Sequence, residues 1–142
     1  IGLADLHAAS ICIETWQAYE RLGSPEGDLS LARAVCYLAL APKSNAVYKA
    51  FNSARKLAQQ TGSMPPPLDI LNAPTQLMKE NGFGDGYIYD HDSENAFAGQ
   101  NFFPKELSRE VFFNPVERGF ERELKKRVTY FEKLRLKRDR NT

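Results

Sequence analysis

Residues 24–57 decide the fold, and they read SPEGDLSLARAVCYLALAPKSNAVYKAFNSARKL. The central part, 31–41, is apolar all round except for Arg33, which is typical of a helix buried on most of its sides. Pro42 ends this helix, because a proline pushes the residue before it out of the α conformation. Ser44 then caps a second apolar-periodic segment. The stretch predicts two helices joined by a short connection and packed as a buried, near-antiparallel hairpin.

The flanking segments predict that the rest of the chain is also largely helical. Asp5 is a plausible cap of a first helix, and Gly23 is its stop. The last helix has the strongest start signal, with Asn114 as cap and Pro115 in the first turn. Glu117 stands at the third helical position, where its carboxylate can accept the backbone N–H of the cap residue. Beyond residue 136 the sequence KRDRNT is expected to fray. The expected helices lie at about 6–22, 25–40, 45–61, 75–81 and 115–136.

Residues 82–113 are expected to be mainly non-helical. Gly82, Gly84 and Gly86 alternate with larger residues, and glycines at this density indicate turns with positive φ. The aromatic residues at 87–89 and 96–103 favour a short strand or an extended arm. A phosphate-binding loop is disfavoured, because it needs glycines between a strand and a helix N-terminus and here the order is reversed. The chain also contains no G-x-x-x-x-G-K-[ST] motif, so we expect no nucleotide hydrolysis by it alone.

The composition is that of an ordinary globular protein and favours one domain spanning residues 1–142. The net charge of +1 hides a basic stretch at 117–140, where ten Lys/Arg and five Asp/Glu leave a net charge of +5. Cys12 and Cys36 lie in apolar helical segments and are expected to be small buried hydrophobes without a disulfide. No apolar run approaches a membrane span and no signal-peptide pattern is present, so we expect a cytoplasmic protein.

Few residues have the pattern of a reactive site. Asp90, His91 and Asp92, with Glu94, are the one cluster of possible metal ligands, but adjacent residues rarely converge on one ion. A solvated or hydrogen-bonded loop histidine is the favoured interpretation. A cysteine nucleophile is equally disfavoured, because an apolar helix disfavours the thiolate. We therefore expect no catalytic, cofactor-binding or metal-binding residue in this chain.

The basic last helix is the candidate for nucleic-acid contact. The side chains that would reach phosphates are Lys125, Lys126, Arg127, Lys133 and Arg135. Interleaved glutamates also fit an ordinary salt-bridged helix surface, which is the simpler interpretation. The aromatic residues of 87–113 leave a similar choice between a base-stacking platform and cover for a core or a subunit contact.

Several phrases of the chain, taken together and in order, resemble one known family. They are SPEG at 24–27, YLALAPKSNA at 37–46, NAPT at 72–75, GFGDGY at 82–87 followed by His91-Asp92, and PVERGFE at 115–121. The opening IGLAD at 1–5 fits as well, whereas 93–96 matches no motif and NPVE at 114–117 and FFP at 102–104 are variants. The chain resembles the C-terminal region of the replication-associated recombination protein A (RarA/MgsA) family of AAA+ ATPases, relatives of the Werner-helicase-interacting protein.

This resemblance implies an all-α domain similar to a clamp-loader collar, which assembles the parent enzyme into a homotetramer. The parent would be a DNA-stimulated ATPase of replication forks, with ATP and Mg bound in a core that this chain lacks. The implied partners are further copies of the chain, DNA through the parent and a single-stranded-DNA-binding protein, with no membrane. The implied location is the nucleoid. Direct DNA binding by the basic last helix is the alternative function.

Overall fold

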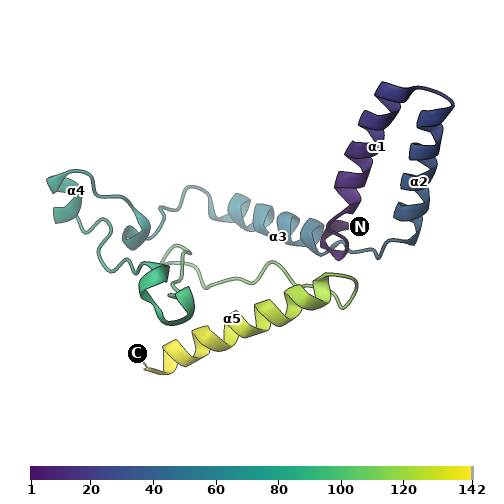
Figure 1. Cartoon of the computed structure of the whole chain (residues 1–142). Coiled ribbons are helices and arrows are strands. Elements are labelled where there is room, and N and C mark those ends of the chain that lie inside the picture. Colours follow the sequence, from purple (N-terminus) through teal and green to yellow (C-terminus); the bar gives the residue numbers. More distant parts are fainter. Residues whose placement is uncertain (142) are drawn as a thin grey trace. The chain divides into compact units, whose positions relative to one another are not determined.

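The computed structural model describes residues 1–141, and their side chains as far as Asp139. The α-helices are α1 (Ala8–Leu22), α2 (Glu26–Leu40), α3 (Ala46–Thr61), α4 (Gln76–Glu80) and α5 (Glu121–Asn141) (Figure 1). Single 3-10 turns are η1 (Gly2–Ala4), η2 (Leu68–Ile70), η3 (Asp90–Asp92) and η4 (Glu94–Ala96). The described residues form no strand, which confirms the all-α class and corrects the strand considered at 87–89.

The chain folds into two compact units. Unit 1 comprises residues 1–55 and 112–128, and unit 2 comprises 56–111 and the described residues from 129 onward. Helices α3 and α5 therefore each begin in unit 1 and end in unit 2.

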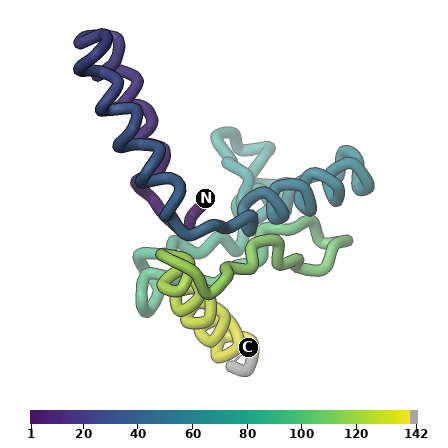
Figure 2. Tube along the Cα trace, turned by 90° about the vertical axis from the view of Figure 1, so that its right-hand side faces the viewer, coloured from purple at the N-terminus to yellow at the C-terminus, as the bar shows by residue number. Residues whose placement is uncertain are grey.

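Helices α1 and α2 form the antiparallel hairpin of unit 1 and run side by side (Figures 1 and 2). Gly23, with φ of 67°, ends α1 as the sequence predicts. The helices approach closely at Gly27, where an added Cβ would lie 2.8 Å from the Tyr19 ring. Thr15 and Ala34 are buried nearby. Small residues on the facing sides thus hold this pair together.

The predicted hairpin of the second and third helices is therefore wrong, because α2 packs on α1. Ala41 does leave the α region before Pro42, with ψ of 141°, but the connection to α3 is extended and does not fold the chain back. The apolar segment 31–41 is correspondingly exposed on most sides, with Val35 66% and Leu40 87% accessible.

The N-terminal turn η1 ties the segments of unit 1 together at the base of the hairpin. Ser44 donates its backbone N–H to Ile1 O at 3.1 Å, and the Phe120 N–H reaches Ala4 O at 2.8 Å. Ala4 is itself buried, and an added Cβ on Gly119 would lie 2.0 Å from its oxygen. Three distant stretches of sequence meet here through backbone contacts.

Helix α5 begins later than the sequence predicts. The predicted start at Asn114 and Pro115 is wrong, because Gly119 takes a φ of 51° against Ala4 and breaks any earlier helix. The fully buried Glu121 instead opens α5, and its carboxylate accepts the Val116 N–H at 2.8 Å.

The end of α5 also differs from the prediction. The helix continues to Asn141 instead of fraying beyond 136, whereas Thr142 lies outside the described residues. Contacts from the last turns explain this, since Arg138 donates to Ala98 O and Arg135 donates to Gly99 O at 3.2 Å.

In unit 2, the Thr75 hydroxyl accepts the Met78 N–H at 3.3 Å and caps α4. The positive φ values predicted for Gly82, Gly84 and Gly86 are confirmed, at 78°, 76° and 81°.

Candidate functional site

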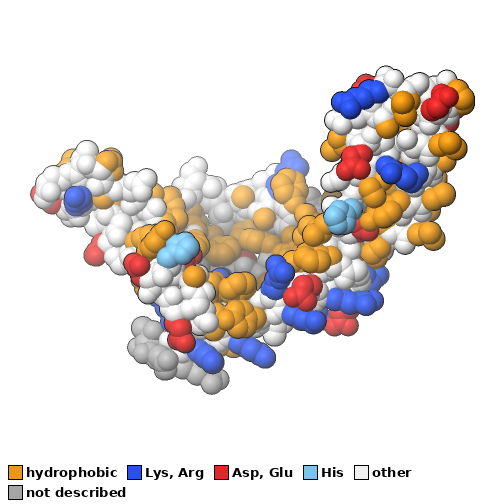
Figure 3. Space-filling view, viewed as in Figure 1, with side chains coloured by type: hydrophobic (Ala, Val, Ile, Leu, Met, Phe, Trp, Pro, Cys, Tyr) orange, Lys and Arg blue, Asp and Glu red, His pale blue; other side chains and the backbone are white. Residues whose placement is uncertain are grey.

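The α1–α2 hairpin exposes far more large apolar side chains than isolated surface positions would require. Trp16 is 65% accessible, and Ile13 on α1 and Val35 on α2 are similarly exposed. Hydrophobic side chains consequently appear at the surface of both helices (Figure 3). Contiguous apolar surface of this kind marks an interaction site in a soluble protein.

Helical geometry gathers many of these side chains on one side of the hairpin. At about 100° per residue, positions 9, 12, 13 and 16 share one face of α1, and positions 31, 35 and 38 share one face of α2. The two faces adjoin, because the helices are antiparallel and contact each other along the neighbouring Thr15–Gly27–Ala34 seam. We call this surface the hairpin face, and it comprises Ala9, Cys12, Ile13, Trp16, Leu31, Val35 and Leu38.

An apolar depression of about 480 Å³ continues the hairpin face toward the base of unit 1. Ala9 and Cys12 of α1 line it together with Leu38 of α2, which supports the shared orientation of these residues. Cys12 and Cys36 are exposed free thiols, so the prediction that they are buried is wrong. The surroundings of Cys12 are apolar, as predicted, but the described residues leave both thiols exposed.

Helix α3 exposes a second apolar strip, which we call the α3 strip: Val47, Tyr48 and Phe51. The Ser44 hydroxyl accepts the Ala46 N–H at 3.1 Å, so the predicted cap is present. The predicted one-sided pattern holds along the helix, yet Phe51 is 64% accessible. Periodicity identified the strip correctly but could not say whether this chain covers it.

The basic residues of α5 in unit 1 are interleaved with glutamates. Lys125 pairs with Glu117 at 2.5 Å, and Lys126 and Arg127 approach Glu123 at 3.5 and 3.8 Å. The Lys125 ammonium donates a hydrogen bond to Glu117 and thereby lowers the pKa of that carboxyl. These pairs are solvent-exposed and weak, so they leave the cations accessible to another anion.

In unit 2, the two remaining candidates behave differently from each other. Lys133 is exposed, whereas the Arg135 guanidinium donates to Gly99 O and Gln100 O and lies 4.9 Å from the Phe97 ring centroid. Burial lowers the pKa of Arg135, and Glu132 opposes that shift. Arg135 therefore fastens α5 to the 97–100 segment. Nucleic-acid contact through α5 stays a prediction.

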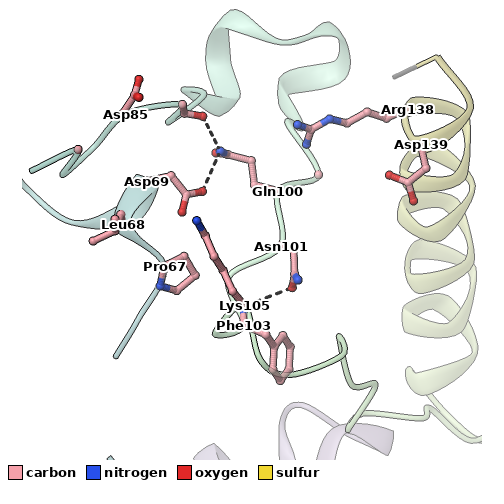
Figure 4. Close-up of a pocket in the computed structure, with 13 residues that line it drawn as sticks. Pro67, Leu68, Asp69, Asp85, Gln100, Asn101, Phe103, Lys105, Arg138 and Asp139 are labelled. Carbon is pink, nitrogen blue, oxygen red and sulfur yellow. Dashed lines mark hydrogen bonds between the residues drawn. The ribbon is translucent and has the colours of Figure 1, made fainter. Parts of the chain in front are cut away.

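A polar pocket of about 660 Å³ lies within unit 2 (Figure 4). Gln100, only 8% accessible, organises its wall by accepting the Ile88 N–H at 3.1 Å and donating to Gly86 O at 3.1 Å. The Lys105 side chain points toward Asp69 in the middle of the pocket. The lining carries charges of both signs, which defines no single class of ligand. Its members are Pro67, Leu68, Asp69, Gly82, Asp85, Gly86, Gly99, Gln100, Asn101, Phe103, Lys105, Arg138 and Asp139.

The sequence analysis missed Gln100 and the buried Glu121, because each is defined by partners remote in sequence or by an unexpected helix start. The possible metal ligands form the turn η3, in which Asp90 accepts the Ala98 N–H at 2.7 Å and His91 packs near Tyr89. Within the described part of the chain, no three His, Cys, Asp or Glu side chains are grouped to hold an ion. None of the helices described is long and apolar enough to cross a membrane.

The chain is similar to proteins of known name. Replication-associated recombination protein A of Coxiella burnetii is 45% identical over 135 residues, which cover 94% of this chain and 31% of that protein. The protein of the same name in Escherichia coli is 40% identical over 131 residues, covering 92% and 29%. ATPase WRNIP1 of Dictyostelium discoideum is 33% identical over 114 residues, covering 80% and 13%. The chain thus spans less than a third of the length of these relatives.

The family model described as MgsA AAA+ ATPase C terminal matches residues 1–132. This match covers the hairpin, α3, α4 and the first half of α5, and it confirms the resemblance seen in the sequence motifs. The chain belongs to the family of MgsA AAA+ ATPase C-terminal regions.

Proposed function

We propose that residues 1–142 form one C-terminal assembly domain that brings a DNA-dependent AAA+ ATPase together as a homotetramer. The parent protein would act in replication-fork maintenance and recombination, as the names of its relatives suggest. ATP and Mg would bind in the ATPase part of the parent, DNA and a single-stranded-DNA-binding protein would be its partners, and its location would be the nucleoid. This chain would contribute assembly and not catalysis.

The observation that carries the proposal is the exposed hairpin face. Burying a side chain such as Trp16 or Val35 stabilises a protein by about 1.5–3 kcal/mol. The hairpin face presents several such residues to solvent in a single chain. Contact with further copies of the chain would bury them, and family membership in an AAA+ ATPase supports self-assembly as the reason.

Analytical ultracentrifugation of the 142-residue chain tests the proposal. We expect the sedimenting mass to exceed that of one chain and the Val35→Asp variant to shift it toward the monomer. Val35 is two-thirds exposed, so the substitution should leave the helices intact. Arg33→Gln is the matched control, because it makes the same change of charge at an exposed position that lies two residues from Val35 and therefore on the opposite side of α2. A chain that stays monomeric at high concentration would refute the proposed assembly function.

Direct DNA binding through α5 is the second candidate function. The Lys126 side chain is 77% accessible, so it can contact DNA phosphates in addition to forming its ion pair with Glu123. Neutralising Lys125, Lys126 and Arg127 to glutamine should weaken DNA binding and reduce its salt dependence by a slope of up to about three. Unchanged affinity and slope would exclude these residues as phosphate contacts.

A further inference from the structure

The chain carries two unpartnered apolar surfaces in unit 1, the hairpin face and the α3 strip. Among the described residues, α1 and α2 are the pair of α-helices that make extensive contacts with each other. The α3 strip therefore does not pack on the hairpin of its own chain. Phe51 on α3 and Val35 on the hairpin remain about equally exposed. An assembly in which each surface met a copy of itself would need two separate interfaces. One interface suffices if the two surfaces bind each other.

The two surfaces belong to elements of opposite charge. Residues 5–40 contain five acids and two bases, a net charge of −3. Helix α3 contains three bases and no acid, a net charge of +3. The acids are Asp5, Glu14, Glu20, Glu26 and Asp28, the hairpin bases are Arg21 and Arg33, and the α3 bases are Lys49, Arg55 and Lys56. Contact between two hairpins, or between two α3 helices, would bring like charges together.

The charges nearest the two apolar surfaces are also complementary. Glu20 and Asp28 lie toward the tip of the hairpin on the same side as Trp16 and Val35, by the helical spacing of α1 and α2. Arg55 follows Phe51 by four residues and flanks the α3 strip in the same way. Among the described residues, neither Glu20 nor Arg55 forms an ion pair.

The dimensions of the two surfaces match as well. At 1.5 Å per residue, the α3 strip and its arginine extend about 12 Å from Val47 to Arg55. The hairpin face and the flanking Glu20 extend about 16 Å from Ala9 along α1. An α3 helix laid along the hairpin face can therefore place its apolar residues against Val35 and its arginine near the acidic tip.

We propose that the hairpin face of one copy binds the α3 strip of the next copy. This inference rests on the proposed assembly function and names the two surfaces that meet. Such a contact is heterologous, because different surfaces of identical chains join. Each copy uses both surfaces once. If the rotation from one copy to the next closes on itself, the copies form a ring, and otherwise they form a filament. In a ring of four, both apolar surfaces of every copy are buried.

Two variants, each with one of the two surfaces disabled and called here the broken variants, distinguish this heterologous contact from a symmetric one. Val35→Asp disables the hairpin face, and Phe51→Asp disables the α3 strip, both at largely exposed positions. We expect each variant alone to sediment as a monomer. Mixed in equal amounts, they should form a one-to-one pair with the mass of two chains, because one intact hairpin face remains to bind one intact α3 strip. Ser53→Asp on the far side of α3 is the matched control and should assemble like the unmodified chain.

A charge exchange tests the register without disturbing apolar residues. Arg55→Glu and Glu20→Arg should each weaken assembly by roughly tenfold in dissociation constant, because each places like charges together. The chain carrying both substitutions should recover most of the affinity. Lys49→Glu makes the same charge change on the far side of α3 and should leave the constant within about twofold.

The possible outcomes separate the two claims. A monomeric unmodified chain overturns both the assembly function and this inference. An assembling chain whose mass is unaffected by Phe51→Asp and Arg55→Glu overturns this inference alone, as does a mixture of the two broken variants that forms no pair. Far-UV circular dichroism checks that each variant is folded, and Arg55→Glu remains decisive should Phe51→Asp fail to fold.

Discussion

At the scale of single residues, Gly119 has the tightest surroundings of any glycine in unit 1. It combines a φ of 51° with the Ala4 carbonyl, which would lie 2.0 Å from an added Cβ. Gly23 has a similar φ of 67° but open space around it. Gly119 thus carries two constraints, backbone conformation and close approach, where Gly23 carries only the first.

We expect Gly119→Ala to lower the free energy of unfolding by about 3 kcal/mol or more. Gly23→Ala, at φ 67° and ψ −171° but with open space around it, should cost less, about 1–3 kcal/mol. The excess loss for Gly119→Ala reports the contact with Ala4, because both glycines have a positive φ but only Gly119 has a close neighbour. Urea unfolding of the two proteins, followed by circular dichroism, provides both values. Equal losses would show that the close approach does not contribute to stability.

The Tyr37 hydroxyl donates to both oxygens of Asp5, at 2.8 and 3.0 Å. This hydrogen bond lowers the pKa of Asp5 below its ordinary 3.8 and raises that of Tyr37 above its ordinary 10.0. Asp5 therefore stabilises the fold above pH 3.8, and this is lost as the pH falls through the lowered value. Tyr37 stabilises it below pH 10.0, and this is lost as the pH rises through the raised value.

Tyr37→Phe removes both contributions, so its stability deficit should be greatest near pH 7 and shrink toward both extremes. Urea midpoints of the two proteins at pH 3, 7 and 11 provide the comparison. A deficit that is the same at all three pH values would show that the loss comes from packing and not from the hydrogen bond.

At the scale of elements, the sequence predicted where most helices lie but not what they pack against. Local signals act within a few residues, so Gly23, Pro42 and Ser44 marked element ends correctly. The partner of α2 depends on small residues meeting across a helix pair, which periodicity cannot reveal. The start of α5 was predicted wrongly for a similar reason, because the conformation of Gly119 depends on its contact with Ala4, more than a hundred positions away.

The 86–100 segment of unit 2 depends on one buried amide. Gln100→Leu keeps the size of the side chain but leaves the Ile88 N–H and Gly86 carbonyl without their partner. We expect a loss of about 2–3 kcal/mol in the free energy of unfolding and faster hydrogen exchange at the Ile88 amide. Asn101→Leu, at an exposed neighbouring amide, should cost less than about 1 kcal/mol. Unchanged exchange at Ile88 would contradict this role.

At the scale of the whole molecule, the sequence predicted an apolar centre correctly and misjudged where it is buried. A segment such as 31–41 has the same composition whether or not its own chain covers it. Only the structure, with Val35 and Leu40 exposed, shows that the described residues leave this segment open to solvent. The predicted DNA-contact residues face a similar limit, because Arg135 and Lys133 look alike in sequence but only Arg135 is engaged by the 97–100 segment.

Trp16 is the single tryptophan of the chain and lies on the hairpin face, so its fluorescence reports directly on that surface. In one chain its side chain is largely exposed, and assembly through the hairpin face would bury it. We expect the emission maximum to shift to longer wavelength on dilution, and iodide quenching to strengthen over the same concentrations at which the mass falls. Val35→Asp should show the exposed spectrum at every concentration, whereas Arg33→Gln, on the opposite side of α2 from Val35, should follow the unmodified chain. If the mass changes with concentration while Trp16 remains equally quenchable, the copies meet elsewhere than on the hairpin face.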